Sequence, residues 1–211
     1  MFDLVDQLPD SFEYEGLSGP LDLSFDNVLN VYRQLKREDV SESARVRLVC
    51  YLLTGEMYDA VSIDQVAELV TYLYKTYIDS HKPQLTSDHS EKQQAELYDL
   101  DEDADYIFAS FMQDYGMDLL EQRGKLHWYK FCALLAGLTE QTKFMQVLSI
   151  RSADPNEKGL SSKQKHAIRE AQLQYQLHVT NEDVAFSKLD MLEKDQYLRD
   201  HPDYLKRISG N

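Results

Sequence analysis

Four aspartates recur at every second position in one short stretch: Asp99, Asp101, Asp103 and Asp105. Carboxylates at this spacing invite comparison with an EF-hand loop, which binds calcium through side-chain oxygens. Such a loop also needs a glycine at its sixth position and a glutamate at its twelfth. Counted from Asp99, those positions hold Ala104 and Ser110, and a count from Asp101 finds neither required residue. We therefore expect the acidic run to cap a helix or to form a solvated face rather than to bind calcium.

His127 is a second candidate, because an imidazole can ligate a metal or act as a base. It precedes Trp128 in a mostly apolar stretch, and the one potential ligand near it is Cys132, five residues further on. We therefore expect His127 to be a packed or helix-capping histidine. The other histidines form no constellation: His81, His89, His166, His178 and His201.

The sequence lacks the short motifs that mark common enzyme classes. It contains no glycine-rich phosphate loop, no Gly-x-Ser-x-Gly and no His-Glu-x-x-His. Few of its acidic residues fall in apolar surroundings that would shift a pKa. We predict that the protein is not an enzyme and that it has no catalytic, cofactor-binding or metal-binding residues. A metal-dependent enzyme is kept as a rival, which calorimetry with divalent ions would test.

The chain is strongly acidic, with 22 Lys and Arg against 37 Asp and Glu and a net charge of −15. This charge repels a phosphate backbone, so direct binding to nucleic acid is not expected. The acidity is concentrated in residues 1–151, which hold 13 basic and 27 acidic residues, while residues 152–211 hold 9 and 10. Without accompanying arginines, the many aromatic side chains are expected in the core or at protein interfaces rather than stacked on bases.

The elements that carry these residues are expected to be helices, because Pro and Gly are scarce and helix-favouring residues are plentiful. The most apolar stretch lies between residues 128 and 138. At helical spacing it predicts a central core helix with one buried side: Trp128, Phe131, Cys132 and Leu135. The stretch is too short to span a bilayer, which takes roughly 20 apolar residues, and no membrane association is expected.

Local signals place the other elements. Serine or threonine before an apolar stripe predicts a helix start, and glycine after it predicts a stop. The predicted starts are Ser24, Ser41 or Ser43, Ser62 and Thr139, and the predicted stops are Gly55 and Gly116. Residues 11–23 predict a β-hairpin whose chain reversal lies at residues 16–20.

Composition divides the chain into two parts. We predict an acidic, mainly α-helical domain over residues 1–151, with the short N-terminal β-hairpin and a mobile linker near residues 79–97. After a break, residues 152–211 predict a C-terminal helical arm or extension that orders against a partner or packs loosely on the domain.

The two cysteines point to a reducing compartment. Cys50 and Cys132 both fall in apolar helical patterns, where a free thiol packs as a small hydrophobe, and two cysteines do not make a disulfide framework. The first residues lack the basic start and apolar run of a signal peptide. We therefore expect the protein in a cytosol.

Residues 98–151 carry a combination of motifs. Residues 98–119 read YDLDEDADYIFASFMQDYGMDL, residues 124–138 read GKLHWYKFCALLAGL, and residues 146–151 read QVLSIR. This combination resembles the bacteriophage gene-product-fifteen family, found in phages and prophages of Gram-positive bacteria. The resemblance covers residues 1–155 best.

The resemblance implies a protein of the phage tail module, since relatives are typically encoded next to the tape measure protein, in the place of a tail assembly chaperone. It carries over no catalytic residues. We expect the chain to bind the tape measure protein, and other tail proteins, in the host cytoplasm before the tail tube polymerises. The rivals are a structural tail component retained in the virion and an acidic DNA mimic or host-interaction protein. The sequence does not name the partner-binding residues, and it leaves homo-oligomerisation open.

Overall fold

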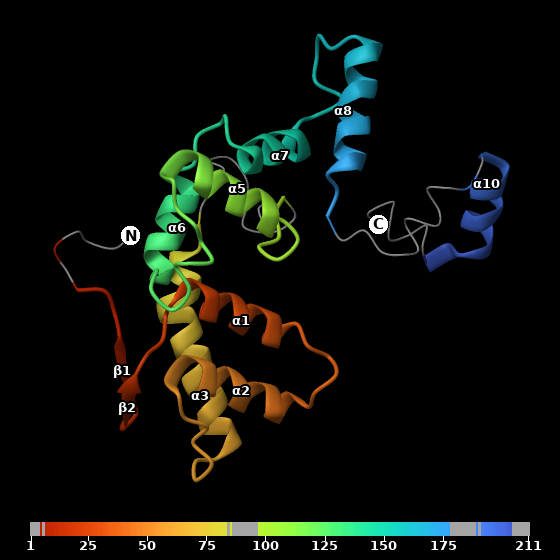
Figure 1. Cartoon of the computed structure of the whole chain (residues 1–211). Coiled ribbons are helices and arrows are strands. Elements are labelled where there is room, and N and C mark those ends of the chain that lie inside the picture. Colours follow the sequence, from red (N-terminus) through yellow and green to blue (C-terminus); the bar gives the residue numbers. More distant parts are fainter. Residues whose placement is uncertain are drawn as a thin grey trace. The chain divides into compact units, whose positions relative to one another are not determined.

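The structure is a computed structural model that describes residue 5, residues 7–83, residue 85, residues 97–177, residue 189 and residues 191–203. The chain divides into two compact units, Met1–Ser152 and Ala153–Asn211. Helices dominate both units, and a two-stranded hairpin lies near the N-terminus (Figure 1). The predicted mainly α fold with an N-terminal hairpin and C-terminal helices is confirmed.

The hairpin consists of β1 (Ser11–Tyr14) and β2 (Leu17–Pro20), which pair antiparallel. Glu15 and Gly16 reverse the chain with φ angles of 47° and 81°. Two successive positive φ angles give the tight turn whose twist matches that of the flanking strands. The predicted hairpin is present and Gly16 lies in its turn, but the rest of the break expected at residues 16–20 was wrong, because Leu17–Pro20 form the second strand.

Three helices follow: α1 (Phe25–Leu35), α2 (Glu42–Thr54) and α3 (Ile63–Leu73). Ser41 and Ser62 start α2 and α3 as predicted, since each hydroxyl accepts a backbone N–H three residues on. Gly55 ends α2 in the left-handed conformation, also as predicted. Ser24 occupies the predicted N-cap position of α1, but its hydroxyl donates to Asp22 instead of capping the helix.

The α3 helix continues into a π-helical turn, η1 (Tyr74–Ile78), and a 3-10 turn, η2 (Asp79–His81). The first residues of the predicted linker 79–97 are therefore helical. Residues 84 and 86–96, which make up most of that linker, lie outside the described residues.

The second half of this unit contains α5 (Ala104–Tyr115), α6 (Trp128–Ala136) and α7 (Lys143–Ser152). Gly116 ends α5 as predicted, again in the left-handed conformation. The predicted start of α7 at Thr139 was wrong, because α7 begins at Lys143. The backbone N–H and the hydroxyl of Thr139 both donate to Asp114 at the end of α5, so this threonine fastens the loop instead.

The core is organised around α6, whose predicted buried side is confirmed: Trp128, Phe131, Cys132 and Leu135 are all buried. The Phe131 ring stacks on Phe25 of α1 at 5.0 Å, on Phe111 of α5 at 5.5 Å and on Trp128 at 5.6 Å between ring centroids. Such offset aromatic pairs stabilise a core beyond the area that they bury. Phe131 thus joins three helices in one aromatic cluster.

The unit Ala153–Asn211 contains α8 (Ser162–Gln174) and α10 (Met191–Asp200). Ser161 and Gln164 form a reciprocal capping box at the start of α8. None of the residues of α8 is buried, and the Leu173 side chain is 66% exposed. In the part of the chain that the structure describes, no helix has the length and apolar character needed to cross a bilayer.

Candidate functional site

The acidic run of residues 99–105 lies where α5 begins, and its most buried member is Asp103. The Asp103 carboxylate forms a bidentate ion pair with Arg151 of α7, with N–O distances of 2.7 and 2.8 Å. The Asp103 side chain is 1% exposed and the Arg151 side chain is 8% exposed. Arg151 also donates to the Leu97 carbonyl at 2.9 Å, so one guanidinium holds the segment before α5 against the end of α7.

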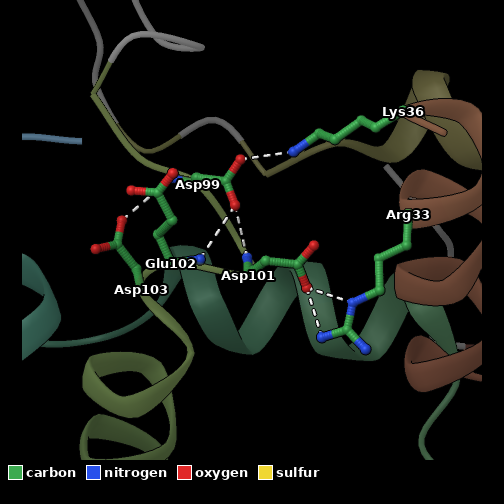
Figure 2. Close-up of polar contacts among 6 residues, drawn as sticks. All are labelled: Arg33, Lys36, Asp99, Asp101, Glu102 and Asp103. Carbon is green, nitrogen blue, oxygen red and sulfur yellow. Dashed lines mark hydrogen bonds and ion pairs between the residues drawn. The ribbon is translucent and has the colours of Figure 1, made fainter. Parts of the chain in front are cut away.

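Asp99 organises the turn that precedes α5 (Figure 2). Its carboxylate accepts the backbone N–H groups of Asp101 and Glu102, at 2.8 and 3.2 Å, and the Lys36 ammonium at 2.7 Å. Partial burial of Asp99 raises its pKa, but these hydrogen bonds to the charged carboxylate outweigh burial, so the pKa of Asp99 lies below its ordinary value. The Asp99 backbone N–H in turn donates to Asp103 at 3.1 Å.

Asp101 extends the same network to the surface. It pairs with Arg33 of α1 at 2.6 Å, where the two side chains are 32% and 56% exposed (Figure 2). Three aspartates of the run are therefore held by cations: Arg33 of α1, Lys36 directly after α1, and Arg151 of α7. The expected helix capping was wrong: Asp99 caps the turn before α5, and the side chain of Asp103, at the N-cap position of α5, makes no capping hydrogen bond. The alternative of a solvated face is wrong for Asp103, which is buried against Arg151.

His127 caps α6, as the sequence predicted. Its Nδ1 accepts the backbone N–H of Tyr129 at 3.1 Å, and its Nε2 lies 3.1 Å from the Pro9 carbonyl. Nδ1 accepts a hydrogen bond, so it carries no proton, and the Pro9 carbonyl can only accept one, so Nε2 must donate. The imidazole is therefore neutral, with its proton on Nε2. This one side chain joins the segment before the hairpin to the core helix.

Acid is expected to weaken the fold through His127. Burial lowers the pKa of His127 below its ordinary value of 6.5, and the Pro9 carbonyl raises it by less. Since the folded state favours the neutral ring, the free energy of unfolding is fully retained above pH 6.5. It falls as the pH drops below 6.5, until the lowered pKa of the folded state is passed.

Urea titrations at several pH values check this expectation. His127→Asn keeps a capping side chain without a titrating group, so its stability should depend less on pH than that of the unchanged protein. Burial also lowers the pKa of His81, which stacks on Tyr129 at 3.5 Å between ring centroids. A His81→Gln variant therefore measures how much of the pH dependence of stability comes from His81. Identical pH profiles for the unchanged protein and His127→Asn would contradict the assignment.

A groove lies between α1, α5 and the loop before α6, and its volume is about 390 Å³. We call it the α1–α5 groove. Its apolar lining is mostly buried or half-buried: Phe25, Leu29, Ile107, Phe108, Leu119 and Phe131. Leu120 also lines the groove and is 57% exposed. A cavity of this size and composition accommodates large apolar side chains.

The charged residues of the α1–α5 groove are Asp26, Arg33 and Arg123. Asp26 accepts the backbone N–H of Gly124 at 2.8 Å, and Arg33 is paired with Asp101. Arg123 is exposed, and it has no hydrogen bond or ion pair with any other residue that the structure describes. No local pattern in the sequence indicates this groove, because its lining comes from four separate segments: α1, residues 100–108, residues 119–123 and Phe131 of α6.

The residues singled out from sequence thus serve the fold. The acidic run and His127 fasten segments to one another. The groove adjoins the Arg33–Asp101 pair, because Arg33 is among its lining residues. Within the described ranges, no group of three or more His, Cys, Asp or Glu side chains could hold a metal ion.

A family model described as bacteriophage Gp15 protein matches residues 4–177 of the chain. No curated protein and no solved structure matches the chain.

Proposed function

We propose that this chain, which belongs to the bacteriophage Gp15 protein family, is a tail assembly chaperone that binds the tape measure protein before the tail tube polymerises. The family match makes the chain a bacteriophage protein. The matched residues include the α1–α5 groove and helix α8. The groove is the observation that supports the chaperone role. On this proposal the chain acts in the host cytoplasm, and other tail proteins are further partners.

The physical argument starts from the tape measure protein itself. A very long helical chain exposes apolar surface until tube subunits enclose it, and exposed apolar surface aggregates. Amphipathic helices bind partners by placing their apolar face in a hydrophobic groove, and the α1–α5 groove offers such a lining. Residues 1–151 carry a net charge of −14, which favours the solubility of a complex.

Co-expression with the tape measure protein of the same phage or prophage tests the proposal. A tagged full-length chain should recover the tape measure protein in the soluble fraction, and omission of the chain should leave the tape measure protein insoluble. Recovery of none of it would contradict the chaperone role.

Purified phage particles separate a chaperone from a structural tail component. An assembly chaperone should be absent when the proteins of the particles are identified by mass spectrometry, whereas a component of the tail should be present in stoichiometric amount. The acidic run lends no support to a DNA mimic, because Asp99, Asp101 and Asp103 are neutralised by Lys36, Arg33 and Arg151.

A further inference from the structure

We infer that the α1–α5 groove receives an acidic amphipathic helix, whose large apolar side chains enter the groove and whose carboxylates pair with Arg123. This inference rests on the proposed function for the identity of the partner, which would be a segment of the tape measure protein. It adds the surface that binds and the chemistry of the segment that is bound.

The lining of the groove fits the apolar face of a helix. Leu29 and Phe108 are half-buried and Leu120 is 57% exposed, so an entering side chain would cover apolar surface that now contacts water. The buried rings of Phe25 and Phe131 also line the groove. Removing such apolar surface from water favours binding.

Charge selects the occupant. The charged residues of the lining are Asp26, which accepts the backbone N–H of Gly124, and two arginines, Arg33 and Arg123. Because residues 1–151 carry 13 basic residues against 27 acidic ones, attraction of a carboxylate must come from a cation at the groove itself. Arg33 already has a carboxylate partner, whereas Arg123 is exposed and lacks one among the described residues. A guanidinium binds a carboxylate in a planar, two-point geometry, and arginines of this kind are enriched among the residues that dominate interface energies.

A second copy of this chain would offer a less suitable helix. Helix α8 exposes Leu173, but its charged side chains are mainly basic: Lys163, Lys165 and Arg169 against Glu170. Basic side chains would face Arg123, which makes this contact electrostatically unfavourable. The inference therefore commits to an acidic partner helix and treats self-association through α8 as an outcome of the test.

Fluorescence anisotropy with a designed helical peptide tests the groove directly. The probe has leucines along one face and glutamates beside them, and a matched peptide has lysines in place of the glutamates. The full-length chain should bind the glutamate peptide at least about tenfold more tightly than the lysine peptide. Arg123→Glu should reverse that preference, and Leu120→Asp should weaken binding of the glutamate peptide about tenfold or more.

Two matched controls lie outside the groove lining. Lys75→Glu makes the same change of charge at an exposed position in η1, and Leu173→Asp makes the same substitution at an exposed leucine of α8. Both should bind like the unchanged chain. No binding by the unchanged chain, or equal affinity for Arg123→Glu and Lys75→Glu, would overturn the inference, and loss of binding in Leu173→Asp alone would assign the contact to α8.

The recovery of tape measure protein distinguishes failure of this inference from failure of the proposed function. If the unchanged chain recovers the tape measure protein and Arg123→Glu recovers it equally well, the chaperone role stands and the groove is not its surface. If the glutamate peptide binds as expected but no tape measure protein is recovered, the groove stands as an acidic-helix site and the partner is wrong. Concentration-dependent self-association that Leu173→Asp abolishes would identify a second copy as the occupant.

Discussion

Arg151→Ala is expected to lower the free energy of unfolding by about 3–5 kcal/mol. The substitution leaves the Asp103 carboxylate, which is 1% exposed, without its cation in a site that excludes water. It also removes the donor to the Leu97 carbonyl. Urea denaturation followed by the fluorescence of Trp128, the only tryptophan of the chain, measures the change, because this side chain is fully buried.

Arg33→Ala is the matched control. It breaks an ion pair of the same type in the same acidic run, but that pair is exposed, so its loss should cost under about 1 kcal/mol. Asp103→Asn in the Arg151→Ala background should recover part of the loss, since it removes the uncompensated charge. If Arg151→Ala and Arg33→Ala cost the same, burial is not what gives the Asp103–Arg151 pair its importance.

Trp128→Ala is expected to destabilise the protein by about 3–5 kcal/mol. The indole is fully buried, stacks on Phe131, and donates its Nε1–H to the Ile78 carbonyl at 3.2 Å. The truncation therefore opens a cavity at the start of α6 and leaves a buried carbonyl without its donor. Urea denaturation followed by circular dichroism is the measurement, since the fluorescent residue is removed.

Two comparisons give this result its meaning. Trp128→Phe keeps an aromatic ring and loses the hydrogen bond, so it should cost less than the alanine variant, about 1–3 kcal/mol. Tyr51→Ala, at a side chain of α2 that is 48% exposed, should change stability little. A loss below about 1 kcal/mol for Trp128→Ala would show that α6 is not the centre of the core.

The sequence predicted those features that local chemistry decides. Ser41 and Ser62 were recognisable as helix caps, and Gly55 and Gly116 as helix ends, because each signal lies within a few residues of the backbone that it serves. The buried side of α6 followed from its 3.6-residue period. His127 was recognised as a packed or capping residue, although its contact with Pro9, 118 residues away, was not.

The features that were missed depend on pairing across the fold. Asp103 and Arg151 are separated by 48 residues, and Asp101 and Arg33 by 68, so neither partner could be chosen before the helices were placed. Thr139 resembles a helix cap in sequence, but in the fold its backbone N–H and hydroxyl donate hydrogen bonds to Asp114. Composition indicated aromatic residues in core or interface, and it could not place Arg123 beside Phe25 and Phe131 in one groove.

Phe131 has two neighbours of different kinds: the aromatic cluster that joins α1, α5 and α6, and the open space of the α1–α5 groove. A ligand that binds the groove only in the folded chain would also stabilise the fold, so occupancy of the groove and unfolding would be thermodynamically linked. Substitution of Phe131 would disturb both at once. Exposed positions of the lining that lie outside the aromatic cluster, such as Leu120 and Arg123, can change while the cluster stays intact.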